Sequence, residues 1–466
     1  MPYVFYDTET TGTETAFDQI LQFAAIKTDA DFVELDRFDI RCRLLPHIVP
    51  SPGALRVTKV TPPMLTNPAL PSHYNMIRQI RTKLLEWSPA TFIGYNSLAF
   101  DEDLLRQAFF QNLHPTYLTN TGGNSRGDIM RVSHAIHAYS PDSISVPIGD
   151  NGKQTFRLDR LAPANGYNHD QAHEAMADVE ATIHMARLAH DRTPDIWQAM
   201  VRSVTKNAVK QHVIGESIIS LTEYYFGRAY SWLVTYCGEN PTYDAQLAVF
   251  DLYHDPDDYR GLSIDELVGV LNRSPKVIRS LRANAQPILM PADTAPVSVK
   301  ALQIDPDERQ RRVDIIRGDT DFQARVGQAL ALRFADQEPS PHVEKRIYDG
   351  FPSRNDQALM EQFHRVEWTE RAAIAAKIDD PRLSEFANRL IYFENPQLLS
   401  AEKSAELRTW LVERTMTENE DVPWMTVPKA MRETDDMLAD ATGDEAELLS
   451  EIKDFLCEFD NYFVSN

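Results

Sequence analysis

The first residues restrict the possible folds and functional sites of this chain more than any other stretch, because a strand pattern leads directly into acidic side chains. Residues 3–12 read YVFYDTETTG, in which four apolar or aromatic residues lead to Asp7 and Glu9. Side chains alternate along a strand, so residues two apart share a face and these two carboxylates lie side by side. Like charges this close repel, so one group takes up a proton or the pair binds a cation. Taken alone, such a pair is more often exposed surface than a site.

Residues 1–195 show strand and helix patterns in an order that is typical of an α/β domain. Strand patterns at 20–28 and 33–45 complete a β-meander with the first strand, and a Pro-rich loop follows over 46–65. Apolar residues recur at helical spacing over 73–87. The remaining segments are a strand at 91–96, a helix at 100–112, two segments at 128–139 and 157–166, and a helix at 172–190. This order predicts a three-layer α/β domain.

The rest of the chain divides into two further parts. A chain of 466 residues is too long for one hydrophobic core. Residues 196–345 show short strand patterns with intervening helices, and residues 346–466 show helical patterns broken by prolines. We therefore predict three domains, with boundaries near residues 195 and 345.

Charge and cysteine content narrow the class of protein. The net charge of −22 argues against nonspecific coating of nucleic acid or membrane by the whole surface, although a local basic channel is compatible with it. The acidic segment 431–466 is interpreted as a solvated helical face. No apolar run reaches the roughly 20 residues of a membrane helix. The chain has three cysteines, Cys42, Cys237 and Cys457, and their positions follow no metal-ligand or disulfide spacing. We therefore expect a cytoplasmic protein.

Two other stretches carry acids that could form one site with Asp7 and Glu9. In GYNSLAFDEDLL (94–105), Asp101 lies where a strand passes into a helix, although helix capping alone would explain an aspartate there. In AHEAMADVEAT (172–182), Asp178 lies among alanines, where a buried acid without a partner would be costly. His173 precedes it by five residues and, judged alone, is an ordinary polar or capping residue.

Taken together, these residues predict a metal-dependent site. Four carboxylates in one pocket are tolerable only around cations, and ligands that are all oxygen favour Mg²⁺ or Mn²⁺. Two such ions about 3.5–4 Å apart form the arrangement that enzymes use for in-line attack at a phosphodiester. His173 would then accept the proton of the attacking water near neutral pH.

Three motifs resemble those of the DEDD superfamily of 3′–5′ exonucleases, in the subgroup that uses a histidine. They are DTET at 7–10, YNSLAFD ending at Asp101, and the His-x4-Asp of His173 and Asp178. The stretches LQFAAIKTDADF (21–32), NSRGDIMR (124–131) and IYDGFPSRNDQALM (347–360) narrow the resemblance to bacterial exonuclease I. Gly127 departs from that family, which often has a bulky aromatic residue at this position.

This resemblance implies a fold and an activity. Residues 1–195 would form an RNase H-like exonuclease domain, residues 196–345 an SH3-like β-containing domain, and residues 346–466 a helical domain that closes over the DNA. The enzyme would be a processive, monomeric exodeoxyribonuclease I in DNA repair and recombination. It would hydrolyse single-stranded DNA 3′–5′ with two Mg²⁺ ions per active site, or Mn²⁺ as a substitute, and release 5′-mononucleotides. The implied protein partner is the acidic C-terminal tail of single-strand DNA-binding protein.

The resemblance also assigns roles to single residues. His173 is the general base, favoured over His169, which misses the spacing. Arg157 is a substrate contact or, equally, part of an ion pair at a helix start. The metal ligands are Asp7, Glu9, Asp101 and Asp178, and the other substrate contacts are Glu9, Thr10 and Asn96.

Candidate DNA contacts outside this site are less specific. Basic clusters occur at 202–212, 276–282 and 307–318, and each is more readily interpreted as an ordinary charged face than as a DNA contact. In the second cluster, Lys276, Arg279 and Arg282 recur at helical spacing and predict a basic stripe. Five aromatic residues offer either stacking surfaces or core packing, and a few basic residues are weak candidates for the partner pocket. These are Tyr224, Tyr225, Phe226, Tyr230 and Trp232, and then Lys300 and Arg309 to Arg312.

Two alternatives stay open. An RNA-acting member of the superfamily is typically much shorter, so the roughly 270 residues after the nuclease domain argue against it. A noncatalytic DNA-binding scaffold would be favoured by the loss of a site residue, and all five are present.

Overall fold

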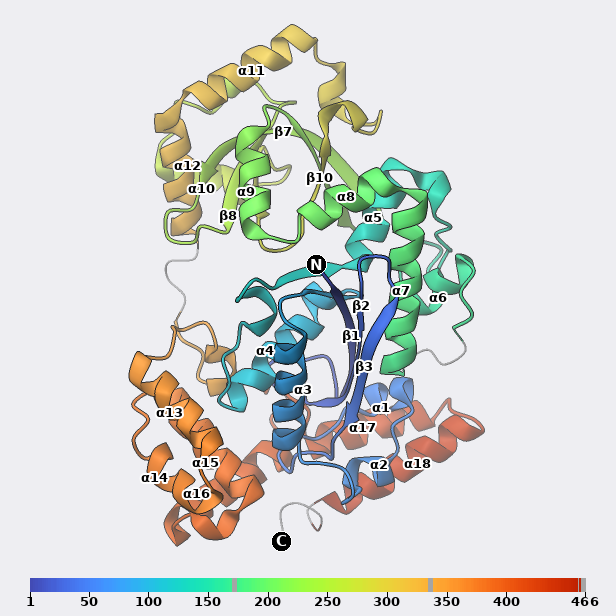
Figure 1. Ribbon diagram of the computed structural model, residues 1–466, viewed down its shortest axis with the longest axis vertical. Coiled ribbons are helices and arrows are strands. Elements are labelled where there is room, and N and C mark those ends of the chain that lie inside the picture. The colour runs from blue at the N-terminus through green and yellow to red at the C-terminus, as the bar shows by residue number, and fades with distance from the viewer. Residues whose placement is uncertain (170–173, 334–337, 460, 462–466) are drawn as a thin grey trace.

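The chain forms three parts along its long axis, as the computed structural model in Figure 1 shows. The structure describes residues 1–169, 174–333, 338–459 and 461. The first sheet lies in the centre, a second sheet with its helices lies above it, and the last helices lie below and to one side (Figure 1). Among the described residues, no helix is both long enough and apolar enough to cross a membrane.

The first sheet is mixed and places the acidic strand at its centre. Its order is β3-β2-β1-β4-β5, with β1 antiparallel to β2 and parallel to β4. The strands are β1 (Tyr3–Thr10), β2 (Ile20–Thr28), β3 (Glu34–Arg41), β4 (Thr91–Gly94) and β5 (Ser125–Asp128). The predicted β-meander of the first three strands is confirmed.

Helices cover both faces of this sheet, which confirms the predicted three-layer arrangement. Helices α3 (His73–Trp87) and α4 (Asp101–Gln111) pack on the face that carries Val4 and Tyr6. Helices α5 (Ile129–Tyr139), α6 (Leu158–Ala164), α7 (Ala175–Arg192) and α8 (Pro194–Arg202) pack on the face that carries Phe5. Because side chains alternate, Asp7 and Glu9 share the α7 face, and Thr8 shares the α4 face.

The Pro-rich segment 46–65 was predicted to be a loop, and this was wrong. It contains two short helices, α1 (Pro52–Thr58) and α2 (Pro62–Thr66). Each begins with a proline that follows a serine or threonine, Ser51 or Thr61. Proline suits the first turn of a helix, because its missing N–H has no partner there in any case.

The second sheet is entirely antiparallel, with the order β10-β6-β7-β8-β9. Its strands are β6 (Ile219–Tyr225), β7 (Arg228–Glu239), β8 (Gln246–Asp251), β9 (Ile278–Arg282) and β10 (Ile288–Pro291). The helices beside it are α9 (Lys206–Gly215), α10 (Ile264–Asn272), α11 (Pro306–Gly318) and α12 (Thr320–Leu332). The predicted β-containing middle region is therefore present.

The basic stripe predicted over 276–282 is wrong, because this segment contains strand β9. Residues three apart on a strand point to opposite faces. Arg279 is buried, with its guanidinium carbon 3.2 Å from the centre of the Trp232 ring, whereas Arg282 is exposed. The two arginines therefore belong to different surfaces.

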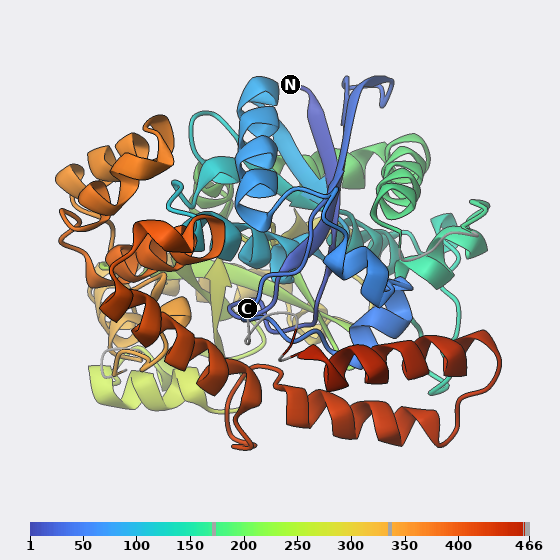
Figure 2. The ribbon, with the colours of Figure 1, turned by 90° about the horizontal axis from the view of Figure 1, so that it is seen from below.

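The last part of the chain is helical, as predicted, and it packs against the first part in two places. One apolar cluster joins α13 (Arg354–Arg365), α14 (Trp368–Ala375) and α15 (Pro381–Glu394) to Tyr74, Phe110 and Leu113. Another joins α17 (Val427–Leu438) and α18 (Asp444–Cys457) to Leu21 and Leu55. Figure 2 shows α17 and α18 running across the lower side of the molecule. The remaining helix of this part is α16 (Ala401–Met416).

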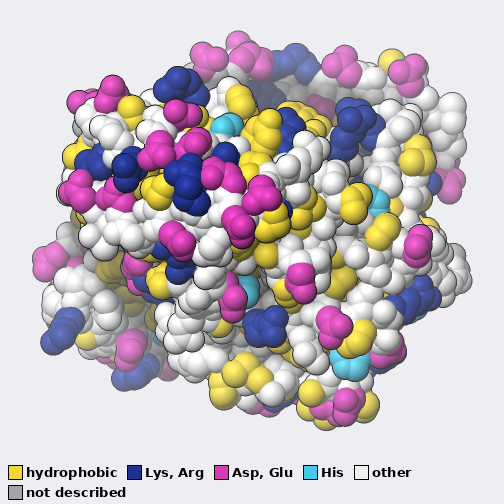
Figure 3. All heavy atoms as spheres, turned by 90° about the horizontal axis from the view of Figure 1, so that it is seen from above, with side chains coloured by type: hydrophobic (Ala, Val, Ile, Leu, Met, Phe, Trp, Pro, Cys, Tyr) yellow, Lys and Arg dark blue, Asp and Glu magenta, His cyan; other side chains and the backbone are white. Residues whose placement is uncertain are grey.

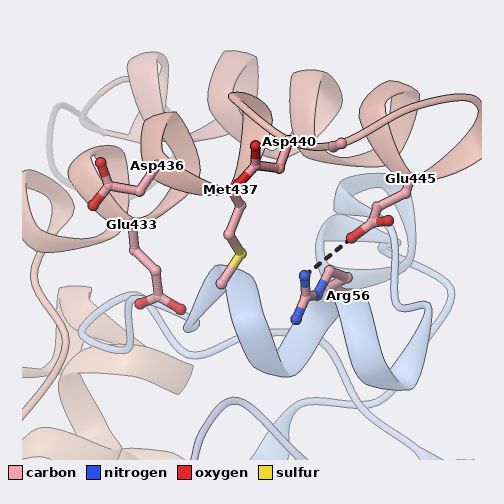
Figure 4. A pocket seen from close by; sticks show the side chains of 7 residues that line it. Arg56, Glu433, Asp436, Met437, Asp440 and Glu445 are labelled. Atoms are coloured by element: carbon pink, nitrogen blue, oxygen red, sulfur yellow. Dashed lines mark hydrogen bonds and ion pairs between the residues drawn. The ribbon is translucent and has the colours of Figure 1, made fainter.

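Polar contacts also join α17 and α18 to α1. Arg56 pairs with Glu445 at 3.0 Å (Figure 4). Glu433 accepts hydrogen bonds from the Ser51 hydroxyl and the Gly53 N–H. Exposed ion pairs contribute little to stability, so the apolar cluster around Leu55 is the main source of attachment. The domain boundaries near residues 195 and 345 stay predictions, and the first falls within the first turn of α8.

Candidate active site

Three of the predicted acids meet at the end of β1. Asp7 and Glu9 extend from β1, and Asp178 lies in the first turn of α7. One carboxylate oxygen from each of the three lies within 4.8 Å of the others. Side chains that are separated by about 170 positions in the sequence therefore form one acidic cluster.

Asp101 joins this cluster from the opposite face of the sheet. It is the first residue of α4 and is 4% exposed, and its Oδ1 accepts a hydrogen bond of 2.5 Å from the Thr8 hydroxyl. The capping residue of α4 is Phe100, which makes no side-chain cap. Helix capping therefore does not explain why an aspartate occupies position 101, whereas the place of this residue beside β1 does.

The acids destabilise one another as charged groups. Burial and the nearby carboxylates of Asp101, Asp178 and Glu9 raise the pKa of Asp7 well above its usual range. Burial and the charges of Asp178 and Asp101 raise the pKa of Glu9 to about 9. Burial raises the pKa of Asp101 to about 7, although the hydrogen bond from Thr8 opposes the shift. Among the described residues, the positive charge of Arg41 opposes this rise in the pKa of Glu9. The ion pair of Arg41 is with Glu174, and its Nη2 lies 3.4 Å from Glu174 Oε1.

These donors fit hard divalent cations. All of them are carboxylate oxygens, which Mg²⁺ and Mn²⁺ prefer. A bound cation would also reverse the electrostatic cost, because it favours the charged form of every acid around it.

The raised pKa values predict that the metal-free protein loses stability as the pH rises. Between about pH 4.5 and 9 the folded state keeps a proton on Glu9 that the unfolded state has lost, so the free energy of unfolding falls with pH across this range. Thermal unfolding in EDTA should show a midpoint at least about 2 °C lower at pH 9 than at pH 6. Added Mg²⁺ should reduce this difference. An equal decline with and without Mg²⁺ would count against the cluster as its cause.

Glu174 is a further acid at this site that the sequence interpretation missed. It caps α7 by accepting from the Ala177 N–H, and it accepts a 2.7 Å hydrogen bond from the buried Gln22 amide. Its charge also raises the pKa of Asp7 and Glu9. The signal was present in the sequence as an acid directly after His173, but the helix was predicted to begin near residue 172 rather than at Ala175.

The predicted base, His173, lies outside the described residues, so its role stays a prediction. His169 is described, and its Nε2 lies 2.7 Å from Asp178 Oδ1, without the alignment of a hydrogen bond. The structure therefore places one histidine of this segment against a candidate metal ligand.

The predicted substrate contacts differ in their surroundings. The Thr10 hydroxyl donates to the Gly12 carbonyl at 2.7 Å, next to the buried Glu9. Asn96 is exposed and adopts a left-handed backbone conformation with φ of 60°. The Arg157 side chain is 66% exposed and makes two 3.0 Å hydrogen bonds to Asp159. The ion pair that was the alternative for Arg157 is therefore present, and its role toward substrate stays a prediction.

Asp128 holds the loop that carries Asn96, and sequence interpretation did not single it out. It is 1% exposed, its carboxylate accepts from the backbone N–H groups of Asn96 and Leu98, and it caps α5. Its own N–H donates to the Gln286 side chain of the middle region. This buried acid therefore has a positioning role that its hydrogen bonds explain.

The space beside Gly127 is already filled. A Cβ atom there would lie 3.4 Å from Ile93, 3.5 Å from Val204 and 3.6 Å from Gln286. These neighbours occupy the volume that a bulky aromatic residue at this position would need. The departure from the family pattern is thus accommodated by packing and does not involve the acidic cluster.

The hydrogen bond from Thr8 to Asp101 predicts that Thr8 orients a metal ligand. Thr8→Val removes the donor with almost no change in shape, whereas Thr8→Ser keeps it. Outer-shell partners of metal ligands contribute about 10–100-fold to metal affinity or activity. The Mg²⁺ concentration for half-maximal thermal stabilisation without DNA should rise by about tenfold in Thr8→Val and remain near the original value in Thr8→Ser. Equal values in both variants would exclude this role.

The mixed sheet, its two helical layers and the carboxylates at the end of its central strand define an exonuclease-type fold with a candidate divalent metal site. Residues 4–186 match the Exonuclease family, and residues 341–459 match the Exonuclease I C-terminal domain. The chain belongs to the bacterial exonuclease I family, and this confirms the predicted family and fold class.

Curated relatives and solved structures match this chain over nearly its whole length. Exodeoxyribonuclease I of Haemophilus influenzae is 29% identical over 91% of this chain and 89% of its own length. Exodeoxyribonuclease I of Escherichia coli is 28% identical, with 88% and 89% covered. The structure of E. coli exonuclease I in complex with a dA16 oligonucleotide has a TM-score of 0.83 at 24% identity, over 98% of this chain and 99% of that chain. The structure of exonuclease I from Methylocaldum szegediense matches this chain with the same TM-score, sequence identity and coverage.

Proposed function

We propose that this protein hydrolyses single-stranded DNA from the 3′ end and releases 5′-mononucleotides. The observation that carries the proposal is the cluster of Asp7, Glu9 and Asp178, with oxygens within 4.8 Å of one another and Asp101 beside them. The fold and family supply the reaction class, and the relatives are named as exodeoxyribonuclease I.

Each residue of the site would have a distinct task. Two divalent cations, Mg²⁺ or Mn²⁺ as a substitute, would supply positive charge to both the attacking and the leaving oxygen when bound. Asp7, Glu9, Asp101 and Asp178 would hold them, and Thr8 would orient the Asp101 carboxylate through its hydrogen bond to Oδ1. His173 would take the proton of the attacking water. Arg157 would exchange the Asp159 carboxylate for a phosphate of the substrate.

The C-terminal helices would help to hold the DNA. A cavity of about 610 Å³ beside Glu9 is lined both by Thr8 and Thr10 and by Trp424 and Lys429 of the C-terminal part. Residues from both ends of the chain therefore border the site, which supports enclosure of the substrate and processive cutting. Selection of single strands would follow from the width of the channel rather than from reading of bases.

The basic clusters predicted from the sequence are largely neutralised within the protein. Lys206 pairs with Asp244, Lys210 pairs with Glu239, and Arg311 contacts three acidic residues. On the face seen in Figure 3, Lys and Arg side chains alternate with Asp and Glu side chains. DNA contacts by these clusters stay predictions.

The finer features of the function follow from the family. We propose a cytoplasmic monomer that acts in DNA repair and recombination and binds the acidic C-terminal tail of single-strand DNA-binding protein. The candidate pocket at Lys300 and Arg309 to Arg312 is weakened by the structure, because Arg311 and Arg312 are already paired with Glu308.

A digestion experiment tests the substrate, the polarity and the metal requirement together. A 5′-labelled single-stranded DNA, the same strand as RNA and a blunt duplex would each be incubated with Mg²⁺ and with EDTA. We expect a shortening ladder on the single-stranded DNA alone, abolished by EDTA. Preference for RNA would indicate the RNA-acting alternative, and tight DNA binding without cleavage would indicate a scaffold.

A further inference from the structure

Glu102 is a buried acid beside the candidate metal site, and three segments outside its own helix supply its hydrogen-bond donors. It directly follows Asp101 in α4 and is 1% exposed. Its Oε1 accepts a 2.9 Å hydrogen bond from the Tyr6 hydroxyl. Its Oε2 accepts from the Thr119 hydroxyl at 2.9 Å and from Arg126 Nη1 at 3.0 Å. A buried carboxylate with this many donors is held in one position.

Two arginines balance the charge of Glu102. The ion pair with Arg126 is buried on both sides. Arg106, four residues later in α4, places Nη2 3.5 Å from the same Oε2 atom. A carboxylate with two cationic partners needs no metal ion for its charge balance. The contacts of Glu102 therefore indicate a supporting role rather than metal binding.

Two hydrogen bonds join β1 to the start of α4. Tyr6 donates to Glu102, and Thr8 donates to Asp101 at 2.5 Å. Residues 6 and 8 share one face of β1, so Asp7 between them points to the opposite face. These two bonds therefore fix the strand that carries Asp7 relative to the helix that carries Asp101.

Arg126 extends this network to the middle region. It lies on β5, the last strand of the first sheet, and its Nη2 donates to the Asn284 carbonyl at 3.2 Å. In the same turn between β9 and β10, Gln286 Oε1 accepts from the Asp128 N–H at 2.7 Å, and its Nε2 donates to the Met200 carbonyl at 3.2 Å. Gln286 is 3% exposed and has a φ of 45°, a conformation that a non-glycine residue keeps only where its surroundings fix it. The middle region is therefore docked on β5 through this turn.

We propose that Glu102 is a positioning residue, through which the docked middle region fixes Asp7 and Asp101 relative to each other for metal binding. Mg²⁺ demands near-ideal octahedral geometry, so its affinity is sensitive to the placement of its ligands. Because it requires a divalent cation at the cluster, this role of Glu102 rests on the proposed function. It gives the middle region a part in metal binding, in addition to any contact with DNA.

A matched pair of variants separates positioning from a contribution to stability alone. Tyr6→Phe and Thr119→Val each remove one buried hydroxyl that donates to Glu102 at 2.9 Å, but only Tyr6 connects Glu102 to the strand of Asp7. The ring at position 6 keeps its packing beside Phe23, with centroids 5.9 Å apart. The Mg²⁺ concentration for half-maximal thermal stabilisation without DNA should rise by about tenfold in Tyr6→Phe and remain near the original value in Thr119→Val.

A double variant tests the connection through Arg126. Glu102→Gln combined with Arg126→Met removes both charges of the buried pair, whereas removal of one alone would leave the other uncompensated. The half-stabilising Mg²⁺ concentration should again rise by about tenfold, although the Tyr6 hydroxyl can still donate to the amide oxygen. In this variant and in Tyr6→Phe, digestion of single-stranded DNA should be slow at low Mg²⁺ and recover at high Mg²⁺.

The original protein separates failure of this role from failure of the proposed function. If Mg²⁺ neither stabilises that protein nor supports digestion, both are wrong. If Mg²⁺ does both, an unchanged Mg²⁺ requirement in Tyr6→Phe, or an equal rise in Thr119→Val, would overturn the role of Glu102 alone. Digestion that stays slow at high Mg²⁺ would also overturn it, because damage to the fold would then explain the loss. If the double variant does not fold, the pair of single variants still decides.

Discussion

Replacement of Asp7 by asparagine is expected to lower the rate of single-stranded DNA digestion by at least about 10³-fold. The amide keeps the size of the side chain but removes one of the charged oxygens on which the metal cluster depends. Loss of about 4 kcal/mol of transition-state stabilisation, within the range of metal-ion catalysis, corresponds to this factor. The initial rate of release of 5′-mononucleotides at saturating Mg²⁺ is the measurement.

The same variant should be more stable than the original protein when no metal is bound. Asp7 is buried beside Asp101, Asp178 and Glu9, and burial and their charges raise its pKa. A neutral amide removes this repulsion, so the unfolding temperature in EDTA should rise and the stabilisation by Mg²⁺ should shrink. Asp31→Asn, in the exposed turn between β2 and β3, is the matched control and should change neither quantity.

An inactive Asp7→Asn protein with a lower unfolding temperature in EDTA would contradict this account. The loss of activity would then reflect damage to the fold rather than loss of a ligand. Activity near that of the original protein would remove Asp7 from the metal site altogether.

The site was largely predictable because its residues carry local signals. Asp7 and Glu9 follow an apolar strand, and Asp101 and Asp178 lie at helix starts, so the acids could be recognised before their positions in space were known. The alternation of side chains along β1 also predicted which two acids share a face. Glu174 was missed because it resembles any acid near a helix start, and its role depends on Gln22 and Arg41 of neighbouring strands.

Features that depend on tertiary packing could not be predicted in this way. The spacing of Lys276, Arg279 and Arg282 fits a helix, but pairing with β8 makes the segment a strand. A cavity of about 710 Å³ between α3 and the segments 113–124 and 347–365 combines residues near 80, 115 and 360, and no periodic pattern connects such distant segments. The neutralisation of Arg311 likewise depends on Asp255 and Asp257, more than 50 residues away.

Replacement of His173 by alanine is expected to lower the rate by roughly 10²–10⁴-fold, the range for removal of a general base. The four carboxylates remain in this variant, so Mg²⁺ should still stabilise the protein against thermal unfolding. The logarithm of the rate should also lose the limb of its pH profile that a histidine of pKa near 6.5 produces.

His169→Ala is the decisive comparison, because His169 lies 2.7 Å from Asp178 and is the alternative base. If His173 is the base, His169→Ala should keep the pH profile, since its effect would pass only through the position of Asp178. A collapse of rate and pH dependence in His169→Ala, with His173→Ala near the original rate, would transfer the role of base to His169. The histidine that contacts Asp178 would then be the general base, and the four-residue spacing between His173 and Asp178 would not identify a catalytic residue.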